Sequence, residues 1–201
     1  MKSVFFLISL CSAISMATPE IVGQKARYNL DKDPKRTSSM IKNGTVDASV
    51  TQHLATEAPP SYEVKLDYKF NIQLIGPSEG SNLEKLDAYY FDPEFLENLR
   101  KNKFYEGTNF KAEHKGFADA KNLDGKVYKN CDVVLLYDIT QVTLANTLFS
   151  FAANNGEEIQ DLKVLVHIYP GIPVLGGVKI DASGKYNGMN VKAGGDYISP
   201  R

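Results

Sequence analysis

The sequence predicts an α+β fold that is β-rich, a mostly antiparallel sheet or sandwich with one or two helices packed on it. The main evidence is the segment from Tyr62 to Leu74, where apolar and polar residues alternate throughout. Successive strand side chains face opposite sides, so this alternation indicates one face for a core and one for solvent. Apolar runs at 131–139 and 162–169 indicate central strands. The elements come in runs of strands, which favours α+β over a regular strand–helix alternation.

A helix is predicted over residues 92–107. Asp92 can cap it, Pro93 suits its first turn, and Arg100 lies near its negative end. Phe95 and Leu99 are four residues apart, so one narrow face can pack on a sheet. Before this helix, residues 76–82 are predicted to break the preceding strand, and residues 83–91 form a weaker extended segment.

A second helix is predicted over residues 140–156, where apolar residues recur at helical spacing, although its first residues could also form a strand. The C-terminal part is predicted to be a hairpin with its turn at 182–185 and a continuation over 186–198. In this interpretation, Gly184, Gly194 and Gly195 are turn positions.

Three parts of the chain are predicted: a signal peptide at 1–17, a flexible leader or linker at 18–60, and a single globular α+β domain at 61–201. The first segment has Lys2, an apolar run and a small residue at Ala17, which together indicate a secretory signal. The apolar run is too short to span a bilayer as a helix, and no later stretch is suitable. We therefore expect a secreted protein, extracellular or periplasmic if bacterial, with no membrane span after signal cleavage.

The predicted leader has few large apolar residues, which is the reason for expecting it to be flexible. Within it, Lys35 and Arg36 form a possible dibasic processing site, and Asn43 begins a glycosylation sequon. Both features matter only in a eukaryotic secretory route. The alternative interpretation of the basic pair is a solvated charge cluster.

Composition limits the class of partner. The formal net charge is −1 and there is no long basic block, so a nucleic-acid binder is not expected. After removal of Cys11, Cys131 is the only cysteine, and no intramolecular disulfide can form. Cys131 either is a small buried residue at a strand start or pairs with another molecule.

No cofactor or metal site is predicted. Gly171 and Gly176 have the spacing of a phosphate-binding loop, but Gly177 and Val178 stand where Lys and Ser or Thr are required. Residues 29–40 resemble a calcium loop in their first acidic positions, yet Pro34 replaces the required glycine.

No catalytic residue is assigned. The three histidines, His53, His114 and His167, lack the close spacing of a zinc motif. A site assembled in space could still combine His114 or His167 with Cys131 or a nearby Asp. The candidate carboxylate pairs are Asp132 with Asp138 and Asp87 with Asp92; the alternative is that these carboxylates are solvated or cap helices.

Residues 178–198 resemble the end of the small β-sandwich repeats of the Cna-B and carboxypeptidase-regulatory kind. The residues that carry the resemblance are Asp181, Gly184, Lys185 and Tyr186, followed by an Ala-Gly-x-x-Tyr pattern. It implies a structural or adhesion role for this segment. The helix upstream does not belong to the repeat.

The functional expectation is an exported non-enzymatic binding or interaction protein, envelope-associated, extracellular or effector-like, without a cofactor. Its partner would be another protein or a surface glycan. The alternative is a secreted hydrolase whose site is assembled from dispersed His and Asp residues. A histidine within hydrogen-bond reach of a carboxylate or Cys131 in a concave pocket would favour the hydrolase. An open edge strand or an exposed apolar patch would favour the binding protein.

Overall fold

The computed structural model describes residues 20–30, 41–58, 60–72, 76–92, 94–107, 110–139, 160–174, 176–186 and 188–198. The strands among these residues join into one ten-stranded antiparallel sheet. They are β1 (Lys25–Leu30), β2 (Ile41–Leu54), β3 (Ser61–Ile72), β4 (Gly76–Asp87), β5 (Phe104–Glu106), β6 (Lys111–Lys121), β7 (Val127–Tyr137), β8 (Gln160–Ile168), β9 (Gly177–Tyr186) and β10 (Met189–Ile198). A short 3-10 helix η1 (Ala88–Phe91) and the helix α1 (Phe95–Asn102) connect β4 to β5.

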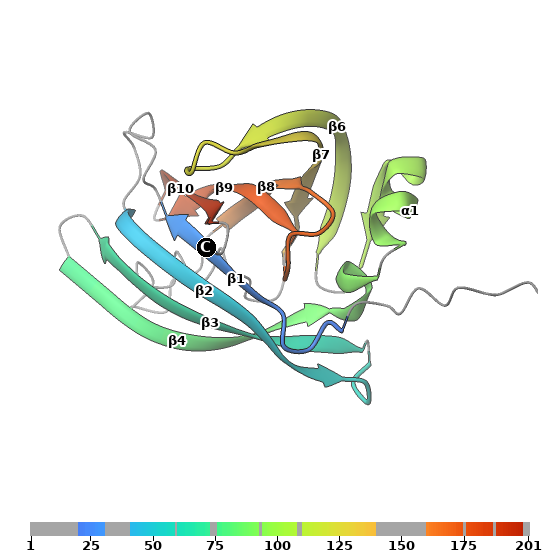
Figure 1. The fold of residues 1–201 in the computed structure, drawn as a ribbon, viewed down its shortest axis with the longest axis horizontal. Coiled ribbons are helices and arrows are strands. Elements are labelled where there is room, and N and C mark those ends of the chain that lie inside the picture. Colours follow the sequence, from blue (N-terminus) through green and yellow to red (C-terminus); the bar gives the residue numbers. More distant parts are fainter. Residues whose placement is uncertain are drawn as a thin grey trace, which may run out of the picture.

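The order of strands across the sheet is β4-β3-β2-β1-β10-β9-β8-β7-β6-β5. Strands that follow one another in sequence therefore pair, except β4 and β5, and the pairing of β1 with β10 joins the two ends of the described chain. In Figure 1, β1–β4 form the lower wall, β6 and β7 arch above β8–β10, and α1 lies at one side. The two edges of the sheet are β4, with twelve residues, and β5, with three.

The core lies on one face of the sheet. Register places Tyr28 beside Val46 and Val46 beside Tyr68, so these three side chains share that face across β1, β2 and β3. All three residues are buried. The alternate residues on the same strands, such as Arg27 and Asp47, point to solvent, as the pleat of a strand requires.

Within the described residues, the expected strand-rich α+β character and antiparallel sheet are confirmed, and the sandwich alternative stays a prediction. The alternating segment from Tyr62 onward is β3, and the apolar runs at 131–139 and 162–169 contribute to β7 and β8. The helix predicted over 92–107 is present as α1 but is shorter, because the chain turns at Lys103, whose φ of 65° is left-handed, and then enters β5. The second predicted helix, at 140–156, lies outside the described residues.

The prediction of a flexible leader over 18–60 is wrong where the structure describes this segment. Residues 25–30 and 41–54 are strands β1 and β2 inside the sheet. β1 carries two large apolar side chains, Tyr28 and Leu30, within only six residues, and β2 carries mostly small or polar ones, so neither segment alone predicts a buried strand. Register supplies the partners: Ala48 lies opposite Leu66, and Leu30 lies opposite Gly195. The globular part therefore begins well before residue 61.

Three further local predictions are wrong. Residues 76–82 do not break a strand but form the first half of β4. The C-terminal hairpin exists, but residues 182–185 are part of β9, and β9 joins β10 between Tyr186 and Met189. Gly184, Gly194 and Gly195 are paired strand residues, not turns. A Cβ at Gly195 would make only ordinary contacts, the nearest 3.6 Å from Leu30 Cδ2.

The polar segment that follows α1 forms β6, which the hydrophobic pattern does not predict. Among the described residues, no helix is long and apolar enough to cross a membrane.

Candidate functional site

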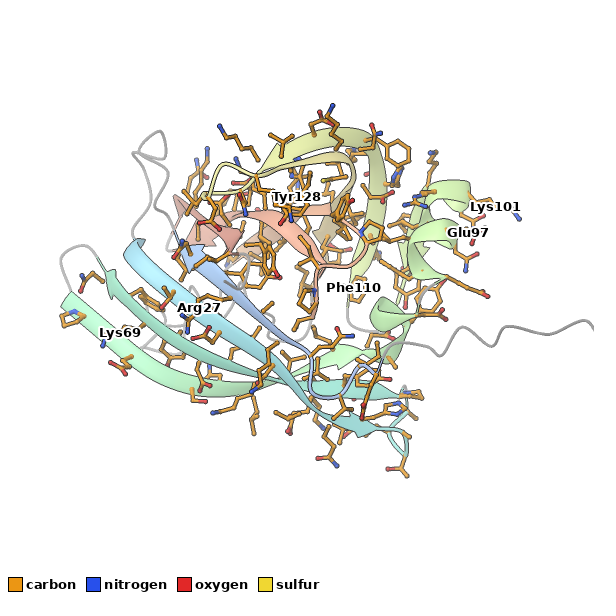
Figure 2. All side chains as sticks on the ribbon, in the orientation of Figure 1. Arg27, Lys69, Glu97, Lys101, Phe110 and Tyr128 are labelled. Atoms are coloured by element: carbon orange, nitrogen blue, oxygen red, sulfur yellow. The ribbon has the colours of Figure 1, made fainter. Side chains whose placement is uncertain are left out.

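Helix α1 is fixed to the inner face of the sheet by two apolar residues one turn apart. Phe95 and Leu99 are 2% and 1% exposed. Phe95 meets Tyr89, Tyr105 and Phe110 in ring contacts with centroid separations of 5.3, 5.5 and 6.4 Å. Figure 2 shows Glu97 and Lys101 pointing away from the sheet on the opposite side of the helix. This anchoring directs Arg100, which follows Leu99, toward β6 and β7.

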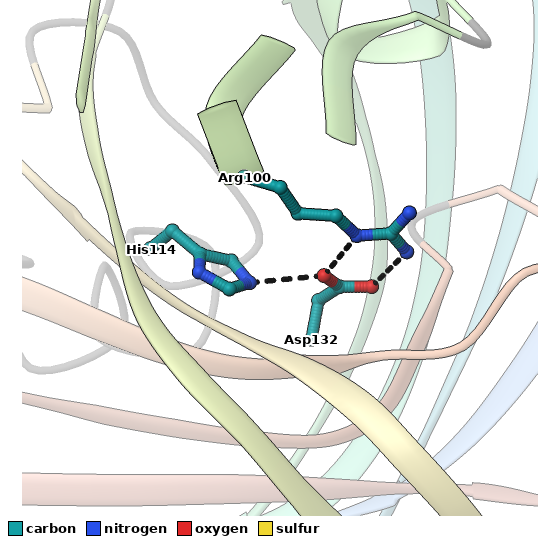
Figure 3. Close-up of polar contacts among 3 residues, drawn as sticks. All are labelled: Arg100, His114 and Asp132. Atoms are coloured by element: carbon teal, nitrogen blue, oxygen red, sulfur yellow. Dashed lines mark hydrogen bonds and ion pairs between the residues drawn. The ribbon is translucent and has the colours of Figure 1, made fainter. Parts of the chain in front are cut away.

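Arg100, Asp132 and His114 form a connected polar cluster, which we call the Asp132 cluster (Figure 3). Arg100 Nε donates to Asp132 Oδ1 at 2.7 Å and its Nη2 donates to Oδ2 at 2.6 Å. His114 Nε2 lies 3.0 Å from Asp132 Oδ1. The three residues come from α1, β7 and β6, so the cluster ties the helix to two neighbouring strands.

A β-bulge shapes the surroundings of the cluster. His114 pairs with Val134 and Gly116 pairs with Val133, which leaves Lys115 as the extra residue on β6. Gly116 has a φ of 117°, which L side chains rarely adopt. After the bulge, Phe117 lies opposite Asp132 and therefore on the same face as His114. Its ring contacts His114 at a centroid separation of 5.1 Å and lies 5.7 Å from Arg100 Cζ.

Burial controls the electrostatics of the cluster. The side chains of Asp132 and His114 are 0% exposed, whereas that of Arg100 is 40% exposed. Burial alone would raise the pKa of Asp132, but hydrogen bonds from Arg100 and His114 outweigh it and hold this pKa below its ordinary value. Asp132 is therefore a charged carboxylate neutralised from one side by Arg100. His114 Nδ1 is buried without a hydrogen-bond partner among the described residues.

The structure brings together His114 and Asp132 from the residues that the sequence singled out, and it separates the others. Cys131 precedes Asp132 on β7, so its side chain lies on the opposite face. Its Sγ donates to the Tyr128 carbonyl at 3.3 Å, and burial raises the pKa of its thiol. No thiolate therefore faces His114.

The remaining histidines lie elsewhere. His167 pairs with Val133 while His114 pairs with Val134, so the two imidazoles face opposite sides of the sheet. Burial lowers the pKa of His167. His53, on β2, stacks on Tyr62 at a centroid separation of 4.4 Å. In the part of the chain that the structure describes, no group of three His, Cys, Asp or Glu residues could hold a metal ion.

The other candidate carboxylates have structural partners. Asp87 caps η1 by accepting from the Tyr89 amide at 2.8 Å, and Tyr105 Oη donates to it at 3.2 Å. Asp92 accepts from the Glu94 amide at 2.8 Å at the start of α1. Asp138 forms an ion pair with Lys111 at 3.1 Å. The contact of Asp87 agrees with the capping alternative. The prediction that Asp92 caps the helix is wrong, because Glu94 is the N-cap residue of α1 and Asp92 binds the chain just ahead of it. Asp138 lies just beyond the end of β7, away from Asp132.

An open cavity of about 750 Å³ lies between the ends of β7, β8, β9 and β10. Charged side chains of both signs line it, and Asp161 forms a salt bridge there with Lys185 at 2.8 Å. Neither His114 nor Asp132 lines this cavity. The histidine–carboxylate pair and the cavity are therefore separate features.

The β4 edge is a second candidate site. We use this name for Glu79, Ser81, Leu83 and Lys85, four alternate residues of the edge strand β4. The amide of Ala88, just after β4, donates to the Pro60 carbonyl beside β3 at 2.9 Å. In an antiparallel pair, the main-chain groups of alternate residues point to the partner and away from it. The even-numbered residues of β4 therefore bond to β3, and the main chain of the β4 edge points outward.

Two observations support this assignment of the β4 edge. Pro77 has no amide hydrogen and falls on the outward series, where β3 requires no donor. The side chains of the β4 edge lie on the outer face: Glu79 pairs with Lys69 at 3.0 Å, and Leu83 is 61% exposed. Lys69 projects from the same outer face in Figure 2. Among the described residues, β4 pairs with β3 alone.

In the part of the chain that the structure describes, the fold is strand-rich, with one antiparallel sheet and a short helix. No protein-family model, curated protein or solved structure matches the chain. The Asp132 cluster and the β4 edge are the two features of the described residues from which a function can be inferred.

The sequence motifs missed both sites for different reasons. The sequence offers His114 and Asp132 as candidates, but it indicates Arg100 only as a favourable charge at a helix end. The β4 edge is not predicted because Gly76, Pro77 and Gly80 of the same strand are typical of a loop. A Pro at an outward strand position is a signal that could have indicated an edge.

Proposed function

We propose that the protein is an exported, non-enzymatic binding protein without a cofactor that pairs with an extended polypeptide strand along the β4 edge. The observation that carries this proposal is the twelve-residue end strand whose alternate main-chain groups point away from β3. Such a row of donors and acceptors is a template for another strand, and strand addition is a common mode of peptide recognition.

The side chains favour a polypeptide over a surface glycan. Leu83 offers an apolar contact at the centre of the β4 edge, between the charges of Glu79 and Lys85. A glycan would be expected on an exposed aromatic surface. Tyr89, which follows this strand in η1, instead stacks on Tyr105 at a centroid separation of 4.8 Å inside the cluster that anchors α1.

Site-specific photocrosslinking in the source cells tests this proposal. A photoreactive residue replaces Leu83 on the β4 edge or Phe117, an exposed residue of β6, which serves as the control position. We expect a crosslink to a polypeptide at position 83 and not at 117. Ser81→Pro in the same chain should abolish it, because proline removes an outward amide that strand addition needs.

Ser81→Ala is the matched control for the proline variant. Both substitutions remove the hydroxyl that hydrogen-bonds to Asp67, but alanine keeps the amide. The crosslink should survive Ser81→Ala. Equal crosslinking at positions 83 and 117, or a crosslink that survives Ser81→Pro, would contradict the proposal.

One observation favours the alternative of a secreted hydrolase, namely the 3.0 Å contact between His114 and Asp132. A catalytic histidine needs access to substrate and a nucleophile to activate. Here both side chains are buried, both Asp132 oxygens accept from Arg100, and Cys131 faces the other way. The same contacts are those of a structural ion pair that holds α1 on the sheet, and we therefore rank the binding protein first.

A further inference from the structure

We infer that the strand that fits the β4 edge is the β4 edge of a second copy of this chain, which would give a twofold dimer with one continuous sheet. This inference rests on the proposed function, because it identifies the partner of the same edge. A twofold interface uses the same surface on both subunits and therefore requires a self-complementary strand. The β4 edge meets that requirement in one antiparallel register.

Main-chain geometry restricts the registers that are possible. Residues whose amides and carbonyls point outward must lie opposite one another, so odd-numbered residues of one β4 face odd-numbered residues of the other. The twofold axis then lies at a residue of the strand and not midway between two residues. With the axis at Asn82, Glu79 lies opposite Lys85 of the second copy, and Ser81 lies opposite Leu83.

Charge selects this register. It places two Glu79–Lys85 pairs across the interface, both on the outer face of the sheet, where opposite charges directly across two strands attract each other. Moving the axis by one residue to Leu83 would put Glu79 opposite Asp87 instead, and moving it to Ser81 would put Lys85 opposite Pro77. Only the axis at Asn82 places both Glu79 and Lys85 opposite a residue of opposite charge.

The exposed leucine supports the same register. Leu83 is 61% exposed in the single chain. With the axis at Asn82, Leu83 and its symmetry mate are diagonal neighbours on one face of the sheet, a separation within reach of long side chains. The two side chains would cover each other, and the dimer would remove an apolar group from water.

Existing ion pairs do not occupy the interface. Glu79 pairs with Lys69 on β3, and Lys85 pairs with Glu57. Both pairs lie at the surface: the side chains of Glu79 and Lys85 are 70% and 49% exposed. A carboxylate can accept from two ammonium groups and an ammonium group can donate to two carboxylates, so each residue can keep its partner and gain the cross-copy one.

Sedimentation-velocity ultracentrifugation of purified protein expressed from the full coding sequence tests the inference. We expect a concentration-dependent dimer. Glu79→Lys or Lys85→Glu alone should weaken it by about tenfold or more, because each turns both cross-copy attractions into repulsions. The double variant Glu79→Lys with Lys85→Glu restores opposite charges across the axis and should recover most of the dimer.

Lys69→Glu is the matched control. It breaks the same intrachain pair as Glu79→Lys and leaves the charges of the β4 edge unchanged, so the dimer should persist. Ser81→Pro should abolish the dimer and Ser81→Ala should not. Should the proline variant fail to fold, as judged by circular dichroism, the charge exchange alone decides.

A monomer at all concentrations up to the solubility limit overturns the inference, as does a dimer that the single charge reversals leave intact or that the double variant does not restore. The outcome for the proposed function is distinguishable from the outcome for the dimer. If the protein is monomeric but position 83 still crosslinks to another polypeptide in a Ser81→Pro-sensitive way, the β4 edge binds a strand that is not a second copy.

Discussion

At the scale of single residues, two aspartates show how burial changes the contribution that the same ion pair makes to the free energy of unfolding. Asp132 and Asp47 each accept two hydrogen bonds from one arginine, Arg100 and Arg27 respectively. Asp132 is 0% exposed, whereas the Asp47 side chain is 45% exposed. Removing a partner from a buried ion pair leaves an uncompensated charge, and solvent screens the exposed pair.

We therefore predict that Asp132→Ala lowers the free energy of unfolding by about 3 kcal/mol, because it leaves Arg100 partly buried and His114 buried without their shared acceptor. Asp47→Ala should change it by about 1 kcal/mol or less. Urea unfolding of both variants and the wild type measures the difference. Equal losses at the two positions would show that the Asp132 cluster has no special role in holding α1.

The ionisation of Asp132 also determines how the free energy of unfolding should change in acid. The pKa of Asp132 in the folded state is below its unfolded value. A depressed pKa contributes stability that is fully present above the unfolded pKa, about 3.9, and is lost as the pH falls through the folded value. Unfolding experiments between about pH 7 and pH 3 should show that Asp132→Asn is less sensitive to acid than the wild type.

Asp47→Asn is the control for the acid experiment, since no buried charge changes there. Its stability should fall with pH in parallel with that of the wild type. An Asp132→Asn curve parallel to both would mean that Asp132 is not held in its charged form by Arg100 and His114.

At the scale of elements, a strand could be predicted where large apolar and polar residues alternate along its own sequence. It could not be predicted where its buried contacts come from the strand paired with it. Residues 61–72 alternate large apolar and polar side chains and are β3. Residues 41–54 alternate small ones, and β2 is recognisable only beside β3. Gly44 shows the dependence: a Cβ there would lie 2.6 Å from Phe70 Cβ, so glycine is required by the neighbouring strand.

The Asp132 cluster was predictable in part for the same reason. The sequence offers His114, Asp132 and Arg100 as residue types, and Phe95 with Leu99 indicates the buried face of α1. The meeting of the three side chains depends on the bulge at Lys115 and on the docking of α1. Both are long-range features that hydrophobic periodicity does not encode.

The bulge in β6 requires a backbone conformation at Gly116 that other residues rarely adopt. Gly116→Ala should lower the free energy of unfolding by about 1–3 kcal/mol, because alanine at a φ of 117° is strained although its Cβ would have open space. Gly195→Ala is the matched control: it lies in β10 without a positive φ, and its Cβ would make ordinary contacts from 3.6 Å. Its unfolding free energy should change by about 1 kcal/mol or less.

Chemical denaturation of the two alanine variants decides the point. An equal effect at Gly116 and Gly195 would contradict a role for backbone strain in β6. A loss confined to Gly116 would support the bulge as the device that sets Phe117 and His114 on one face.

At the scale of the whole molecule, β1 joins two halves that are each built from neighbouring strands. β2–β4 form one run and β5–β10 the other, and β1 pairs with β2 on one side and β10 on the other. Tyr28 and Leu30 of this strand are 0% and 1% exposed. A cut after Arg36, the possible processing site, would therefore separate a central strand from the rest of the sheet.

We predict that a chain beginning at Thr37 does not unfold cooperatively in urea. It loses two fully buried large side chains, worth about 5 kcal/mol or more together, against a total stability of about 5–15 kcal/mol for a typical domain. A synthetic peptide of residues 20–36 added in trans should restore the cooperative transition, because β1 makes all its sheet contacts by pairing with β2 and β10. The same peptide with Tyr28→Pro should fail, since a central strand uses both sets of main-chain groups. A chain starting at Thr37 that unfolds at the wild-type urea midpoint would show that β1 is dispensable and that processing at Arg36 is compatible with the fold.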